Sequence, residues 1–121
     1  TCRPEKSKSI IHIHGESDSI LSPNGSEYLK SFFESIEFWA NFNQCSSSNT
    51  ESVSDTNSDG YSGTIINYNN CSNQVIVTGI LLENFDHQWP STDSQKKQSD
   101  IDAASYIWDF FKKFDVNGLI E

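Results

Sequence analysis

The sequence predicts an α/β fold in which a pair of parallel strands is flanked by two helices. Ile10–His14 is a short β-branched run that ends at Gly15, and Val75–Leu82 is a longer, nearly continuous apolar run, as is typical of buried strands. Each run is followed by a stretch whose apolar residues recur at helical spacing. The order of strand, helix, hairpin with a long strand, and helix indicates a parallel pair joined by a right-handed crossover.

The first half of the chain is expected to form one strand, one helix and one long loop. Ser9–His14 is the strand, and Gly25–Asn43 is the helix, with Asn24 and Glu27 at the spacing of a capping box. Ser46–Gly63 is rich in Ser, Asn and Asp, which predicts a mobile surface loop. The expected buried face of the helix carries Leu29, Phe32, Phe33, Ile36, Trp39 and Ala40.

The second half is expected to form a hairpin and a closing helix. Thr64–Tyr68 and Gln74–Leu82 are the two strands, and a loop over 83–98 follows them. Ser99 and Asp102 are spaced as the start of a helix that Gly118 ends. Its expected buried face carries Ile101, Ala104, Ile107, Trp108, Phe111 and Phe114.

So few strands make a poor sheet on their own, and both helices carry large aromatic faces. A sheet edge and apolar surface stay exposed unless another polypeptide covers them. Residues 1–121 are therefore expected to be part of one domain, and a start at Thr1 suggests a processed product or a piece of a longer protein.

The charge and hydropathy of the chain exclude two classes of partner. The formal net charge is −9 and the lysines are scattered in small groups, so no basic patch is available to neutralise nucleic-acid phosphates. No run of about 18 apolar residues exists, so we expect no membrane partner.

Three cysteines and two glycosylation motifs suggest an oxidising, extracellular setting. Cys45 and Cys71 flank the polar loop and are expected to pair, which leaves Cys2 free or bonded outside the chain. The sequons begin at Asn24 and Asn70, so a secreted glycoprotein is predicted. The alternative is a cytosolic protein with reduced cysteines.

An acid and a histidine follow the two apolar runs. Asp18 comes three residues after Gly15, and His87 follows the long strand. Ligands and catalytic groups of open α/β sheets lie at the carboxyl ends of the strands. Asp18 and His87 are therefore candidate partners in a catalytic site.

Five short motifs occur in the order in which they are found in one enzyme family. They are His12-Ile-His14-Gly15-Glu-Ser-Asp18, Trp39-Ala40-Asn41…Cys45, Tyr68…Cys71, His87-Gln-Trp89-Pro90 and Asp100-Ile-Asp-Ala…Ile107-Trp108-Asp-Phe110-Phe111. On these motifs the chain resembles the secreted polyhydroxybutyrate depolymerases and feruloyl or acetylxylan esterases. The resemblance covers nearly all of the chain and implies the C-terminal portion of an α/β-hydrolase, with a partial parallel sheet and flanking helices.

The resemblance implies a serine esterase in which Asp18 is the acid, His87 is the general base and Trp89 forms a wall of the substrate site. The implied substrates are feruloyl or acetyl esters on polysaccharide, or polyhydroxyalkanoates, and no cofactor is implied. The chain departs from the family at Asp86, where glycine is usual. It also offers no credible nucleophile, because Ser17 precedes the acid by one residue and Ser62 lies in a motif of the wrong spacing. The implied partner is the N-terminal portion of the same precursor, which would supply the serine and the oxyanion hole.

Two other functions fit the same residues. His12 and His14 lie on one face of the predicted strand and, with His87 or Asp18, are candidate zinc ligands. The resemblance instead packs this pair inside the sheet, so we predict no metal. The second alternative is a binding or assembly module that kept the fold and lost the catalytic serine.

Overall fold

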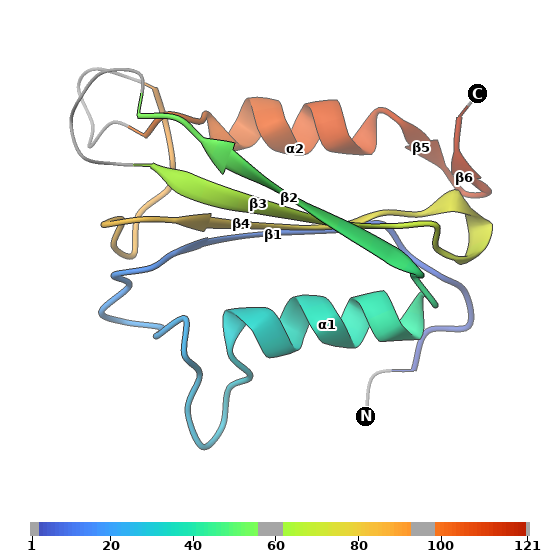
Figure 1. The fold of residues 1–121 in the computed structure, drawn as a ribbon, viewed down its shortest axis with the longest axis horizontal. Helices are drawn as coiled ribbons and strands as arrows, with labels where there is room; N and C mark the ends of the chain where they lie inside the picture. Colours follow the sequence, from blue (N-terminus) through green and yellow to red (C-terminus); the bar gives the residue numbers. More distant parts are fainter. Residues whose placement is uncertain (1–2, 56–61, 93–98, 121) are drawn as a thin grey trace.

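The computed structural model describes residues 3–55, 62–92 and 99–120. In that part of the chain, helices α1 and α2 lie on opposite faces of a four-stranded sheet (Figure 1). A 3₁₀ turn, Ser72–Gln74, and a small hairpin complete the fold. The elements are β1 (Ile10–Gly15), α1 (Phe32–Phe42), β2 (Ser47–Val53), β3 (Gly63–Asn69), β4 (Val77–Leu82), α2 (Ala103–Phe111), β5 (Phe114–Asp115) and β6 (Gly118–Leu119).

The sheet has the order β1-β4-β3-β2. β1 runs parallel to β4, with Ile10 opposite Val77 and Gly15 opposite Leu82. β3 is antiparallel to both of its neighbours, β4 and β2. The parallel pair and the β3–β4 hairpin predicted from the sequence are therefore confirmed.

The more specific expectation of a partial parallel sheet from an α/β-hydrolase is wrong. The sheet is mixed, and one of its three strand pairs in the described residues is parallel. The chain between α1 and β4 folds back twice as antiparallel strands instead of crossing directly to the next parallel strand. Two helices on a small mixed sheet do not make a recognisable portion of that fold.

The error arises mainly at β2, because Ser46–Gly63 was expected to be a mobile loop. Ser47–Val53 instead forms a seven-residue strand at the edge of the sheet. Its side chains are exposed up to Ser52, and Val53 alone is partly buried. An edge strand with solvent on both faces has no need of apolar residues, so its sequence looks like that of a loop.

Helix α1 begins seven residues later than the sequence analysis placed it. The capping box is formed by Ser31 and Glu34: the Ser31 hydroxyl accepts from the Glu34 N–H at 3.1 Å, and the Glu34 carboxylate accepts from the Ser31 N–H at 2.7 Å. Asn24 instead lies in an irregular segment where Gly25 adopts a positive φ of 79°. Residues 24–27 match the box in spacing, but glycine after the cap favours a turn.

The buried face of α1 is narrower than predicted, and it lies close against β4. Phe32, Ile36 and Ala40 are buried, whereas Leu29 and Phe33 are about half exposed. A Cβ at Gly79 of β4 would lie 2.8 Å from the Phe32 ring and 2.9 Å from Ile36. Glycine at this position lets the helix approach the sheet closely.

Helix α2 covers the opposite face and is rotated by about one residue from the predicted orientation. Ala103 and Phe110 are buried, while Trp108 is 68% exposed. Asp102 is the N-cap, accepting from the Ser105 N–H at 3.0 Å. The helix ends at Phe111 rather than at Gly118, because the chain turns back as the β5–β6 hairpin. The buried residues on this face of the sheet are Ile65, Ile80, Leu82, Phe85 and Ile101.

A disulfide joins Cys45 to Cys71, as predicted. It connects the residues after α1 to the β3–β4 connection, and Cys45 packs against the cluster beneath α1. Cys2, for which no partner was predicted within the chain, lies outside the described residues. Neither helix in the described residues is long and apolar enough to cross a bilayer.

Candidate functional site

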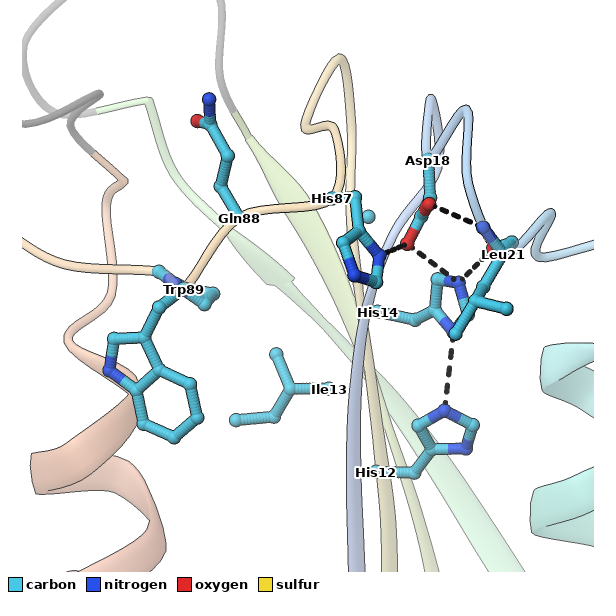
Figure 2. A pocket seen from close by; sticks show the side chains of 10 residues that line it. His12, Ile13, His14, Asp18, Leu21, His87, Gln88 and Trp89 are labelled. Carbon is cyan, nitrogen blue, oxygen red and sulfur yellow. Dashed lines mark hydrogen bonds and ion pairs between the residues drawn. The ribbon is translucent and has the colours of Figure 1, made fainter.

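Asp18 and His87 lie together because each follows one strand of the parallel pair. Asp18 comes three residues after the end of β1, and His87 five residues after the end of β4. The two loops also hydrogen-bond directly, since the Ser17 N–H donates to the Phe85 carbonyl at 3.0 Å. The two candidates separated by 69 residues in sequence thus meet at one edge of the sheet (Figure 2).

The contact between them has the geometry of an acid–base pair. Asp18 Oδ2 lies 2.9 Å from His87 Nδ1. The carboxylate side chain is 7% exposed and the imidazole 50% exposed. The second carboxylate oxygen, Oδ1, accepts from the Ile20 N–H at 2.9 Å and the Leu21 N–H at 2.8 Å. The acid is therefore held by its own loop while the histidine remains open to solvent.

These contacts lower the pKa of Asp18. Partial burial alone would raise the pKa of this carboxyl, but hydrogen bonds from the Leu21 backbone, His87 and the Ile20 backbone outweigh that effect and bring the pKa below its ordinary value. Each of these donors favours the charged form of the carboxyl. Asp18 is consequently an anion throughout the neutral pH range, and it can accept a hydrogen bond from a protonated nitrogen of the imidazole.

Asp86 and Gly15 contribute to the site in ways that the sequence analysis missed. Asp86 Oδ1 accepts from the Ser19 N–H and hydroxyl, both at 2.9 Å, and from the His87 N–H at 2.7 Å. It therefore ties the Asp18 loop to the His87 loop. A Cβ at Gly15 would collide with the Phe85 carbonyl, so glycine lets the two loops touch. A carboxylate next to the histidine was the one available signal, and it was noted as a departure from the family.

His12 and His14 extend the site away from His87. His14 Nε2 lies 2.7 Å from the Leu21 carbonyl and 3.4 Å from Asp18 Oδ2, and His14 Nδ1 lies 3.3 Å from His12 Nε2. The His12 ring packs 5.1 Å from the Phe32 ring. Burial, and then the neighbouring His14, lower the pKa of His12. No group of three ligating side chains suited to a metal ion is found among the described residues.

A cavity of about 560 Å³ opens beside the acid–base pair. Figure 2 shows His14, Asp18 and His87 on one side of it and Trp89 across from them. The Trp89 side chain is 61% exposed, and Ile13 lies on the wall between the two sides. The role of Trp89 in substrate binding stays a prediction. Its aromatic surface is accessible from the cavity.

The structure describes both serines that were considered as nucleophiles. The Ser62 hydroxyl donates to the Glu83 carboxylate at 2.6 Å, and Gly60, from the same motif, lies outside the described residues. Ser17 is exposed in the loop that precedes Asp18. Among the described residues, no serine hydroxyl makes a hydrogen bond to His87.

The two predicted glycosylation sites lie on the surface. Asn24 is exposed in the segment between β1 and α1, and Asn70 is exposed in the β3–β4 connection. The Asn70 side-chain amide donates to the Ser47 hydroxyl at 2.8 Å.

The lowered pKa of Asp18 predicts a pH-dependent stability. Because the folded-state pKa lies below the unfolded value of about 3.9, the contribution of Asp18 is fully present above that value and is lost as the pH falls through the folded pKa. The free energy of unfolding of wild type should exceed that of Asp18→Asn near neutrality, and the difference should shrink as the pH falls below about 4. Urea unfolding at several pH values measures it.

Asp109→Asn is the matched control, because its carboxylate is 61% exposed on α2 and pairs with Lys112. Its difference from wild type should stay small at every pH. If the difference in free energy of unfolding between wild type and Asp18→Asn stays constant or grows as the pH falls, Asp18 is not stabilised as an anion.

Comparison of the sequence with models of known protein families, and with curated proteins, gives no match.

Proposed function

We propose that this chain supplies the acid and the general base of a serine-type hydrolase that cleaves carboxylic esters. The observation that carries the proposal is the 2.9 Å contact between Asp18 Oδ2 and His87 Nδ1. A carboxylate at Nδ1 orients the imidazole, keeps the proton on that nitrogen and stabilises the imidazolium that forms during reaction. Nε2 is then the nitrogen that accepts a proton.

In the proposed reaction, His87 Nε2 takes the proton of a serine hydroxyl as the serine oxygen attacks the ester carbonyl carbon. The tetrahedral intermediate collapses, and the leaving alcohol takes that proton from the imidazolium. Water then attacks the acyl-serine by the same route and releases the carboxylic acid. Every proton moves through His87, so the reaction requires no cofactor.

The nucleophile and the oxyanion hole are assigned to the N-terminal portion of the same precursor. Support comes from β1, whose one strand neighbour in the described residues is β4. The N–H groups of Ile10 and Glu16 bond toward β4, so alternation turns the backbone groups of Ile11 and Ile13 toward the open edge. An additional strand is what such an edge accepts.

The surroundings of this edge favour the same partner. A groove of about 460 Å³ runs along β1 between the two helices, with Trp39 of α1 on one side and Ile107 of α2 on the other. Gln88, Trp89 and Pro90 line both this groove and the cavity beside His87. A polypeptide that fills the groove would therefore reach the acid–base pair.

The proposed substrates are feruloyl or acetyl esters on plant polysaccharide, or polyhydroxyalkanoates. The support is the exposed indole of Trp89 facing the cavity, since flat aromatic side chains stack on sugars and aromatic acyl groups. A secreted, extracellular location is part of the proposal. The Cys45–Cys71 disulfide is compatible with it, because such bonds persist in oxidising compartments.

The proposal predicts that the chain by itself shows no hydrolysis of p-nitrophenyl acetate above that of its His87→Ala variant. The reason is that no serine hydroxyl among the described residues makes a hydrogen bond to His87, and the proposal assigns the nucleophile to the N-terminal portion. Initial rates of both proteins, measured side by side, decide the point. Turnover that depends on His87 in the isolated chain would place the nucleophile within this sequence and contradict the assigned division of roles.

A further inference from the structure

We infer that His14 is a positioning residue, which holds the Asp18 loop and carboxylate in the orientation that His87 requires. This inference rests on the proposed roles of Asp18 and His87 for its catalytic meaning. The contacts that carry it join His14 to the Leu21 carbonyl and to Asp18 Oδ2, the oxygen that His87 also contacts (Figure 2).

The two oxygens of Asp18 have different partners. Oδ1 is taken by the backbone N–H groups of Ile20 and Leu21, within the loop itself. Oδ2 is shared by His87 Nδ1 at 2.9 Å and His14 Nε2 at 3.4 Å. The hydrogen bonds to Oδ1 fix the carboxylate relative to the backbone of its own loop. They do not fix the position of that loop relative to the sheet.

The Asp86 bonds to Ser19 tie the Asp18 loop to the His87 loop, and His14 connects the Asp18 loop to β1. Its Nε2 lies 2.7 Å from the Leu21 carbonyl, and its backbone belongs to β1, which is paired with β4. Leu21 in turn donates its N–H to Asp18 Oδ1 at 2.8 Å. A closed set of contacts therefore runs from the strand through His14 and Leu21 to the acid.

The partners of His14 also fix which of its nitrogens carries the proton. A carbonyl oxygen can only accept, so the nitrogen facing Leu21 must be Nε2–H. In the neutral His14 ring, Nδ1 is then an acceptor, and its neighbour at 3.3 Å, His12 Nε2, is the donor. Burial of His12 against Phe32 favours the neutral ring that such a donor requires. The chain of contacts from His12 to Asp18 thus has one consistent set of proton positions.

Loss of the His14 donor should be visible at His87. A firmly held Asp18 keeps His87 in the Nδ1–H tautomer, which leaves Nε2 as the base. If the loop shifts, Asp18 Oδ2 moves from His87 and the Nε2–H tautomer becomes populated. A role confined to packing would not change which nitrogen of His87 carries the proton.

The test is ¹⁵N-detected NMR of the histidine side chains at about pH 8, where an ordinary imidazole is neutral. His14→Phe keeps a ring against Phe32 and removes the donor, while His14→Gln keeps an N–H near the Nε2 position. We expect the Nδ1–H tautomer at His87 in wild type and His14→Gln, and a mixture of tautomers in His14→Phe. A folded His14→Phe protein with the wild-type tautomer at His87 would overturn the inference.

Wild type alone also provides a test, should His14→Phe fail to fold. Its His14 must be the Nε2–H tautomer, and finding the proton on Nδ1 would contradict the assigned contacts. The tautomers are measured without turnover. These proton positions in a chain whose complex with the N-terminal portion stays inactive would therefore refute the proposed function and leave the positioning role intact. Conversely, a hydrolase reconstituted with its serine portion whose kcat is unchanged by His14→Phe would keep the function and refute the positioning role.

Discussion

Replacing His87 by alanine is expected to lower kcat for ester hydrolysis by about 10⁴- to 10⁶-fold, the range that loss of a triad member produces in serine proteases. The expectation applies to the assembled protein, defined as this chain together with the N-terminal portion of its precursor. His87 is the sole proton acceptor in the proposed reaction, and its Nδ1 contacts Asp18 at 2.9 Å. Without the imidazole, the serine keeps its proton and the leaving alcohol receives none.

Asp18→Asn should produce a loss of about 10⁴-fold in kcat, because an amide at this position favours the wrong imidazole tautomer. Asp109→Asn, on the exposed surface of α2, is the control and should leave kcat unchanged. Steady-state rates on p-nitrophenyl acetate measure all three variants. A His87→Ala protein within tenfold of wild type would remove His87 from the mechanism.

Removal of the disulfide should have the largest effect on stability. Replacing Cys45 and Cys71 together by alanine is expected to lower the free energy of unfolding by about 3.5 kcal/mol, from the entropy of the loop that their separation of 26 residues closes. The bond also ties the end of α1 to the β3–β4 connection, so its loss loosens the helix above β4. Urea unfolding of the double variant measures the difference.

Non-reducing peptide mapping is the companion measurement for the disulfide. It should recover one linked pair of peptides that contain Cys45 and Cys71. A linked peptide containing Cys2 would contradict the pairing. So would a double variant that is less than about 1 kcal/mol below wild type in stability, since the bond then constrains little of the unfolded chain.

Strands that are buried could be predicted from the sequence, and strands at an exposed edge could not. β1 and β4 are rich in β-branched and aliphatic residues because they pack between the two helices. β2 has the sequence Ser-Ser-Asn-Thr-Glu-Ser-Val and is held by backbone pairing with β3, which leaves no trace in hydropathy. Because that strand was missed, the expected sheet lacked its second antiparallel pair, β2–β3.

The sequence predicted that both helices exist, but it did not predict which side of each helix is buried. Aromatic residues lie around most of the circumference of α1 and α2, so the apolar pattern does not select one orientation. The close fit of Gly79 under Phe32 and Ile36 selects the buried side of α1, and such a contact between distant residues is invisible in a single sequence. Trp108 on α2 was likewise expected to be buried and is exposed.

The candidate site was predictable where strand ends determine it. Asp18 and His87 each follow a predicted strand, and parallel strands end at the same edge of a sheet. The contributions of His14 and Asp86 were not predictable, because they depend on hydrogen bonds to Leu21 and Ser19 whose geometry is set only after the loops fold together.

The most direct test of the acid–base assignment is to combine this chain with the N-terminal portion of its precursor and to measure ester hydrolysis. The assignment predicts that the mixture hydrolyses p-nitrophenyl acetate while neither portion does so alone. It also predicts that Asp18→Ala or His87→Ala in this chain abolishes the restored activity. A mixture that forms a stable complex but stays inactive, or one whose activity is indifferent to both substitutions, would contradict the assignment and favour a binding module instead.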